Sequence, residues 1–273
     1  MQASTDMILD LLKGIGLKAM YENYQPLAEE AERDGITHID YLKQLLQLEF
    51  ERRHQARIDR LQKQALIPRD KLLRDFEVSR VPGLSRSVLN RLAEGEFIDR
   101  CENILIFGNP GTGKTHLGIA LSREWCLRGR KVLYKTAAEL VQELMVAKQA
   151  LALNNLIKKL DGFEVLVIDD ISYTLCDRQE ADALFVLLSK RYEQRSIVVT
   201  SNLVFSQWNQ IFKDEMTTAA AIDRLVHHAT ILELNAPESY RVAQAKETKR
   251  VSEQTKNKDL YEGVPTPKVM VTT

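Results

Sequence analysis

The chain has 273 residues, 44% of them hydrophobic, and its 38 Lys and Arg are balanced by 38 Asp and Glu. This predicts a sizeable core in one large domain, or one medium domain with an appendage, and the charge gives no evidence on a nucleic-acid partner. Cys101, Cys126 and Cys176 form no CxxC or Cys/His cluster, which argues against a zinc site or a disulfide framework. Without a bilayer-spanning apolar run or a secretory signal, we expect a cytoplasmic protein with no membrane partner.

Residues 1–65 predict a helical N-terminal domain. Apolar residues keep helical spacing over residues 7–12 and again from Ile39 onward. Gly35 separates the second predicted helix from the third. We therefore expect three helices, the last over about 39–64, in a domain that contacts partners or other copies of the chain.

Basic residues are concentrated toward the end of the third predicted helix. Arg53, Arg57 and Arg60 follow one another at i, i+4 and i+7, so they share one helix face. Such a face is either simply solvated or contacts the phosphate backbone of a nucleic acid.

The next part of the chain, residues 66–250, alternates strands with helix-length segments. Short, nearly all-apolar strands are predicted at 103–107, 131–135, 165–169, 197–200 and 230–234. This order predicts an α/β fold, a five-stranded parallel sheet sandwiched by helices. The polar residues 251–273, with Pro265 and Pro267, are predicted to be a disordered tail.

A glycine-rich loop follows the first predicted strand and leads into a helix, which is the context of a phosphate-binding loop. Its glycines let backbone amides point at a polyphosphate, and the helix start adds positive potential. Lys114 supplies a charge for the β- and γ-phosphates, and Thr115 supplies a hydroxyl for Mg²⁺. We assign ATP binding to Gly108, Asn109, Pro110, Gly111, Thr112, Gly113, Lys114, Thr115 and His116.

Polar residues end two further predicted strands. Asp169 and Asp170 follow Val165-Leu166-Val167-Ile168, and Asn202 follows the strand at 197–200. Asp169 is placed to hold Mg²⁺, and Asp170 to orient or deprotonate the attacking water. Asn202 could reach the γ-phosphate or that water as a neutral hydrogen-bonding group. Two acids that merely cap the next helix, and an Asn that begins a turn, are the alternatives.

An arginine could complete this site from another subunit. Arg224 precedes the last predicted strand and could neutralise transition-state charge in trans, although an ordinary surface Asp–Arg pair is the alternative. Arg191 and Arg195 are rival candidates. We therefore expect the catalytic set to be Lys114, Asp169, Asp170, Asn202 and Arg224.

These motifs together resemble the AAA+ P-loop ATPases of the initiator and helicase-loader clade, and finer features resemble IstB, the helper ATPase encoded beside the transposase in one class of bacterial insertion sequences. The resemblance covers nearly the whole chain. The runs that carry the resemblance to IstB are Glu96-Phe97-Ile98, Asn103-Ile104-Leu105, Lys114-Thr115-His116-Leu117, Thr136-Ala137-Ala138-Glu139-Leu140, Arg191-Tyr192-Glu193-Gln194-Arg195-Ser196, Thr200-Ser201-Asn202-Leu203, Asp223-Arg224-Leu225-Val226-His227-His228-Ala229 and Glu238-Ser239-Tyr240-Arg241.

The resemblance implies a Mg²⁺-dependent ATPase that binds duplex DNA with little sequence preference, multimerises through ATP, bends the DNA, and recruits and stimulates its transposase. It also implies an AAA+ core without a C-terminal helical lid. Asp170 stands where many AAA+ proteins carry Glu, so slow turnover is expected. A replicative helicase loader is the alternative function. A metabolic P-loop kinase is a third, against which the paired acids and Arg224 argue.

The resemblance also suggests where DNA binds. The clade inserts a helical element after the second strand, and here residues 137–162 are long enough for two helices. Lys135, Thr136 and Lys148 are the first candidates for contacts with the DNA backbone, and Arg53, Arg57 and Arg60 the second. A solvated surface charge is the alternative for each basic residue.

Overall fold

The computed structural model describes residues 2–173, 177–235 and 239, with side chains from Met7 onward except that of Tyr173. Cys176, most of the run 238–241 and the predicted tail at 251–273 lie outside the described residues. A five-stranded sheet in the order β2-β3-β4-β1-β5 forms the centre of the fold, and all its pairings are parallel. The predicted fold class is therefore confirmed. The strands are β1 Asn103–Phe107, β2 Val132–Thr136, β3 Val165–Asp169, β4 Ser196–Ser201 and β5 Ala229–Glu233.

The three central strands, β1, β3 and β4, are buried at every residue, as their apolar runs require. The register pairs Phe107 with Ser201, and Thr136 with Asp169. Because all the strands are parallel, their carboxyl ends meet at one edge of the sheet. That edge therefore collects the polar residues that end β2, β3 and β4.

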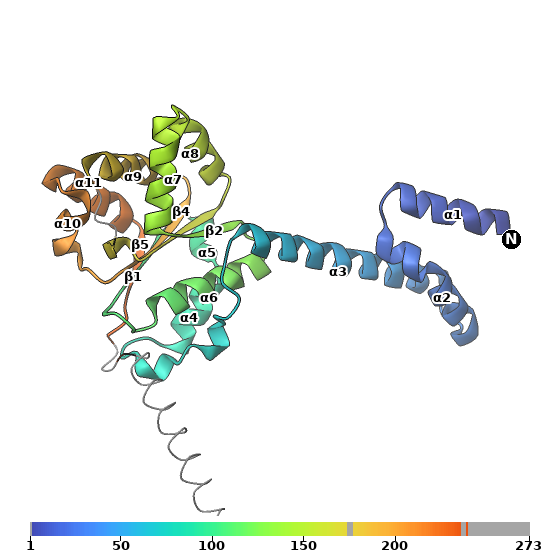
Figure 1. The fold of residues 1–273 in the computed structure, drawn as a ribbon. Coiled ribbons are helices and arrows are strands. Elements are labelled where there is room, and N and C mark those ends of the chain that lie inside the picture. The colour runs from blue at the N-terminus through green and yellow to red at the C-terminus, as the bar shows by residue number, and fades with distance from the viewer. Residues whose placement is uncertain (1, 174–176, 236–238, 240–273) are drawn as a thin grey trace, which may run out of the picture.

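Helices cover both faces of the sheet (Figure 1). One face carries α7 Ala137–Gln149, α8 Leu153–Asp161, α9 Arg178–Arg191, α10 Asn209–Phe212 and α11 Glu215–Val226, and the other carries α4 Arg86–Glu94, α5 Glu96–Asp99 and α6 Lys114–Leu127. The short turns are η1 Leu73–Asp75, η2 Val78–Arg80, η3 Ile171–Tyr173 and η4 Phe205–Gln207. In the part of the chain that the structure describes, no helix is long and apolar enough to cross a membrane.

The N-terminal region forms three helices, α1 Gln2–Gly14, α2 Lys18–Asp34 and α3 His38–Gln64. The long α3 carries α1 and α2 away from the sheet (Figure 1). Leu12, Met20 and Leu45 form a small cluster of their own between the three helices. The buried Glu49 caps α2, because its carboxylate accepts the backbone N–H of Ala19 at 2.7 Å.

The other end of α3 belongs to the core around the sheet. Leu61 and Ala65 are buried in the same cluster as the residues of α4 and α6. The backbone N–H of Tyr134 donates to the carbonyl of Ala65 at 2.9 Å, which joins the end of α3 to β2. The boundary predicted at residue 65 thus falls where the helix contacts the sheet.

Candidate nucleotide-binding site

The phosphate loop connects β1 to α6 at the carboxyl edge of the sheet. Gly108, Gly111 and Gly113 all have positive φ, at 155°, 82° and 96°. A Cβ on Gly108 would lie 2.6 Å from the carbonyl oxygen of Leu234, so only glycine fits there. The loop is closed internally by the Thr112 hydroxyl, which donates to the carbonyl of Asn109 at 2.9 Å.

Lys114 begins α6 and is 7% exposed. Its ammonium donates to the carbonyls of Gly108 at 2.8 Å and Asn109 at 3.0 Å, so the charge lies against the loop. The start of α6 adds the positive end of a 14-residue helix. This arrangement suits a polyphosphate.

Asp169 is buried at the end of β3 and accepts three hydroxyl hydrogen bonds. The hydroxyls of Thr115 and Thr200 donate to Oδ1 at 3.1 and 2.6 Å, and that of Tyr134 donates to Oδ2 at 2.8 Å. Burial, and then the charge of Asp169, raise the pKa of Tyr134 far above its usual value, so its phenol stays protonated. The Asp169 carboxylate is therefore fixed next to the loop.

Asp170 adopts left-handed backbone geometry, with φ at 61°. Its backbone N–H donates to the Thr200 hydroxyl at 2.8 Å. Its Oδ1 accepts hydrogen bonds from the Ser172 hydroxyl at 3.0 Å and from the Asn202 amide at 3.2 Å. The backbone N–H of Asn202 in turn donates to the Ser172 hydroxyl at 2.9 Å. The structure thus brings Asp170 and Asn202 together.

Thr200, Tyr134 and Ser172 belong to this network but were missed by sequence reasoning. Thr200 gave a signal, since it is a polar residue that directly follows the apolar run Ile197-Val198-Val199. Tyr134 gave no local signal, because its contact with Asp169 depends on the position of its strand, β2, beside β3. Ser172 had no signal in the sequence, because the turn after β3 places it.

Arg224 lies at the end of the sheet opposite to the phosphate loop. The amide of Asn103, which begins β1, donates to the carbonyl of Leu225 at 3.1 Å and so fixes the end of α11 there. The Arg224 guanidinium donates to the carbonyl of Ala220 at 2.8 Å and lies 5.0 Å from the ring centroid of Phe185. The phosphate loop begins at the far end of β1, about 17 Å away for a five-residue strand.

The rival arginines differ in exposure. Arg191 is fully buried, and its guanidinium donates to the carbonyls of Leu160, Phe163 and Ser196 at 3.0 to 3.1 Å. It therefore holds its own core together and has no access to another subunit. Arg195 is exposed, and its Nε donates to the carbonyl of Asp161 at 3.2 Å.

The His116 imidazole is directed to the segment before the sheet. Its Nε2 lies 3.0 Å from the carbonyl oxygen of Leu72, and its ring meets Phe76 edge to face at 5.7 Å. Phe76 also packs against the phosphate loop, since a Cβ on Gly113 would lie 3.1 Å from its ring. The segment around η1 thus flanks the loop.

The first predicted DNA contacts lie at the start and end of α7. The Thr136 hydroxyl caps this helix in a reciprocal pair with Glu139. Lys135 forms an ion pair with Glu143 at 2.7 Å, and Lys148 donates to the carbonyl of Gln179 at 3.3 Å. These side chains therefore have contacts within the chain.

The arginines of α3 also differ from one another. Arg53 pairs with Glu49 at 2.8 Å and donates to the carbonyl of Gly16 at 3.2 Å. Arg57 donates to the carbonyl of Gly129 at 3.3 Å, which ties α3 to the turn after α6. Arg60 is exposed.

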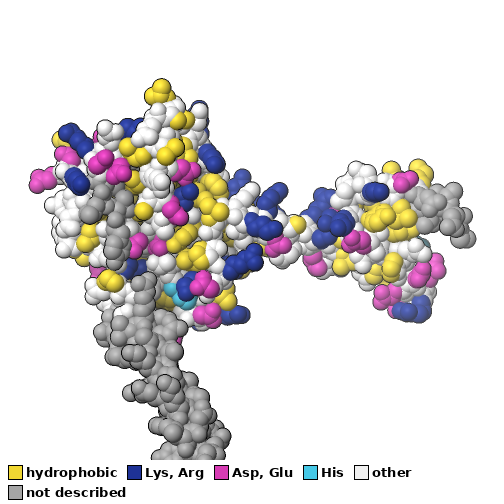
Figure 2. Space-filling model, in the orientation of Figure 1, with side chains coloured by type: hydrophobic (Ala, Val, Ile, Leu, Met, Phe, Trp, Pro, Cys, Tyr) yellow, Lys and Arg dark blue, Asp and Glu magenta, His cyan; other side chains and the backbone are white. Residues whose placement is uncertain are grey.

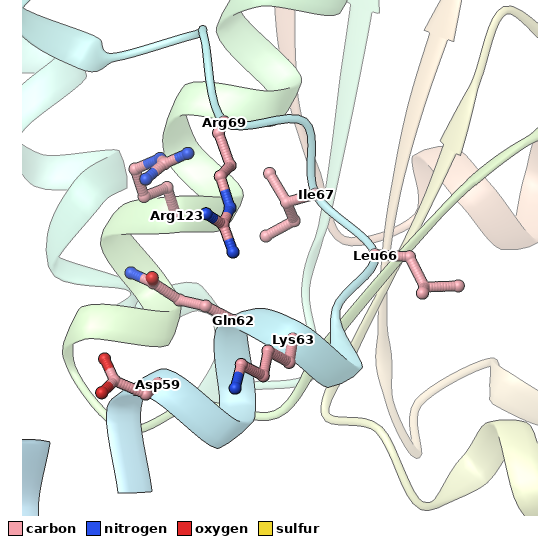
Figure 3. Close-up of a pocket in the computed structure, with 7 residues that line it drawn as sticks. All are labelled: Asp59, Gln62, Lys63, Leu66, Ile67, Arg69 and Arg123. Carbon is pink, nitrogen blue, oxygen red and sulfur yellow. The ribbon is translucent and has the colours of Figure 1, made fainter. Parts of the chain in front are cut away.

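A basic cavity of about 650 Å³ lies between the end of α3, the following linker and α6, away from the phosphate loop. Three cations line it, Lys63, Arg69 and Arg123 (Figure 3). The lining residues are Asp59, Gln62, Lys63, Leu66, Ile67, Arg69 and Arg123.

The sheet order, the phosphate loop and the two acids beside it define an ATPase of the AAA+ class. The fold resembles that of solved replication initiators: a DNA replication initiation factor with a TM-score of 0.55 and the AMPPCP-bound DnaA from Aquifex aeolicus with 0.54, each 20% identical and covering 67% of this chain and 55% of that chain. DnaI matches with a TM-score of 0.50 at 23% identity, over 63% of this chain and 93% of that chain.

The sequence defines the family. The model of the IstB-like ATP-binding proteins matches residues 10–248, so the chain belongs to that family. A putative insertion sequence ATP-binding protein of Sinorhizobium fredii is 40% identical over 88% of this chain and 80% of its own length. The IS21 putative ATP-binding protein of Pseudomonas aeruginosa is 37% identical over 90% of this chain and 92% of its own length. The protein is thus an ATPase of the family that includes the insertion-sequence ATP-binding proteins.

Proposed function

We propose that the protein is an ATP-dependent helper of transposition, which multimerises on duplex DNA, bends it, and recruits and stimulates the transposase of its insertion sequence. One observation carries this proposal. The nucleotide site and Arg224 lie at opposite ends of the same sheet, so Arg224 is far from the phosphate loop of its own chain, which supports a role in the site of another copy. ATP would then hold two subunits together.

The site has groups for binding and hydrolysis. Lys114 and the loop amides would hold the polyphosphate, while Asp170, oriented by Ser172 and Asn202, would orient the attacking water. The Thr115 hydroxyl and the Asp169 carboxylate, 3.1 Å apart, are the oxygen ligands that Mg²⁺ prefers. When bound, Mg²⁺ neutralises charge on the β- and γ-phosphates.

The contacts of the Arg224 guanidinium within its own chain support a role in trans. Its stacking on Phe185 and its hydrogen bond to Ala220 limit its rotamers. The positive charge would stabilise the charge that develops on a neighbour's γ-phosphate during transfer. Formation of the complete site would therefore depend on assembly.

Duplex DNA would be held through its phosphates. Lys and Arg side chains gather along α3 and where it meets the sheet domain (Figure 2). Arg60 is exposed on α3, and Lys63, Arg69 and Arg123 line the adjacent cavity, so this region offers a basic surface to a phosphate backbone. Lys135, Thr136 and Lys148 would add contacts near α7. Such contacts predict binding with little sequence preference and a strong dependence on salt.

The N-terminal helices offer a surface for the transposase. Hydrophobic side chains are exposed on them (Figure 2), which is typical of protein-binding surfaces. They are Met7, Ile8, Leu11, Tyr21, Ile39, Leu42, Leu46, Leu48 and Phe50, together with Ile15 in the turn after α1. A pull-down with the transposase and with a replicative helicase distinguishes the helper from a loader.

The test is assembly on duplex DNA, imaged by electron microscopy and sized by light scattering. With ATP, the wild-type chain should form multimers that bend the duplex. Asp170→Asn should make these multimers persist because hydrolysis is blocked. Asp182→Asn, which changes an exposed Asp on α9, should behave as wild type. DNA binding and particle size that do not depend on ATP would refute the proposal.

A further inference from the structure

Two histidines and a glutamate gather on the surface at the amino-end edge of the sheet, away from the phosphate loop. His227 follows the last residue of α11, His228 immediately precedes β5, and Glu193 lies in the turn between α9 and β4. Their side chains are 51%, 53% and 53% exposed, so an ion could reach them from solvent.

The ligand atoms of these three residues lie within 4.8 Å of one another. Glu193 Oε1 is 3.8 Å from His227 Nδ1 and 3.8 Å from His228 Nε2. The two imidazole rings are 4.0 Å apart between centroids. The fold therefore brings two nitrogens from the connection between α11 and β5 close to a carboxylate oxygen from the connection between α9 and β4.

We propose that Glu193, His227 and His228 bind a divalent transition-metal ion of the Zn²⁺ type. Two imidazoles and a carboxylate are the donors such ions prefer, whereas Mg²⁺ prefers oxygen ligands alone. Ligands about 2.1 Å from a tetrahedral ion lie about 3.4 Å from one another, so small side-chain rotations close the site. Water completes the coordination.

One neighbouring group competes with an ion for His227. The Tyr192 hydroxyl lies 2.6 Å from His227 Nδ1, so an ion bound at that nitrogen would displace this exposed hydrogen bond. Arg224 precedes His227 by about one turn of α11. A bound ion would therefore lie on the surface that carries the proposed trans arginine.

The experiment is isothermal titration of Zn²⁺ into the full-length chain without a polyhistidine tag, in the absence of ATP and DNA. Because no nucleotide or DNA is present, the result is independent of the proposed function. We expect one ion per chain, and a loss of affinity of about tenfold or more in His228→Ala and in Glu193→Gln. His38→Ala, which removes an exposed histidine of α3, should keep wild-type affinity.

Substitution of Co²⁺ gives a second readout. The wild-type chain should show the visible absorption of tetrahedral Co²⁺, and His228→Ala should lose it while its circular dichroism spectrum stays unchanged. Equal Zn²⁺ affinity in wild type and His228→Ala would overturn the proposal, and so would an equal loss in His38→Ala.

Discussion

Replacement of Thr200 by valine tests whether one buried hydroxyl fixes both acids of the nucleotide site. This hydroxyl donates to Asp169 at 2.6 Å and accepts the Asp170 N–H at 2.8 Å, and Thr200 is fully buried. A hydrogen bond to a charged group contributes about 1.5–3 kcal/mol, and a buried N–H left without a partner costs about 1–3 kcal/mol. Because the site relaxes in part, we expect Thr200→Val to lower the free energy of unfolding by about 3 kcal/mol.

The matched control is Thr200→Ser, which keeps the hydroxyl and removes one methyl group. It should cost about 1 kcal/mol, so the two variants should differ by about 2 kcal/mol in urea unfolding. ATP turnover should fall in Thr200→Val and persist in Thr200→Ser, because only the valine variant frees Asp169 and Asp170. Equal stability and equal turnover in the two variants would show that the Thr200 hydroxyl does not hold the two acids.

Other substitutions test the described contacts in the same way. Burial alone would raise the pKa of Glu49, but hydrogen bonds from Arg53, Ala19, Arg52 and Met20 hold this pKa below its usual value. Glu49 therefore stabilises the fold at pH values above its usual pKa, and this contribution is lost as the pH falls through the lowered pKa. Protection of the α2 amides from hydrogen exchange should therefore fall below about pH 4 and in Glu49→Gln, but not in Glu51→Gln; unchanged α2 protection in Glu49→Gln would contradict this. Arg191→Lys should lower the free energy of unfolding by about 3 kcal/mol, because lysine lacks the forked donors, whereas Arg195→Lys on the surface should change it little. Burial raises the pKa of the Cys126 thiol to about 11, so this thiol should resist a disulfide reagent at pH 8 until the chain unfolds, and rapid modification in the native state would refute its burial.

Local patterns in the sequence were sufficient to predict the sheet. The strands are apolar and short, and the phosphate loop lies between a strand and a helix, so hydrophobic periodicity and glycine spacing are enough to predict these elements. Asp169, Asp170 and Asn202 could be grouped because parallel strands end at one edge.

The contacts of individual side chains could not be predicted from the sequence. That Tyr134 and Thr200 both reach Asp169 depends on the order β2-β3-β4, which no local pattern encodes. Arg53 and Arg57 share a helix face with Arg60, but their partners, Glu49 and Gly129, depend on how α3 packs against α2 and α6. Spacing along a helix defines a face and does not say what lies against it.

A mixing experiment tests whether ATP is hydrolysed between subunits. Asp170→Asn chains keep Arg224 but have a disabled site, and Arg224→Ala chains keep the site but lack the arginine. Each alone should be nearly inactive on duplex DNA. In an equal mixture, about one quarter of the interfaces would join an intact site to an intact arginine, so ATPase activity should reappear at about that fraction of wild type. A mixture no more active than its two components, or wild-type activity in Arg224→Ala alone, would rule out a site that Arg224 completes from a neighbouring subunit.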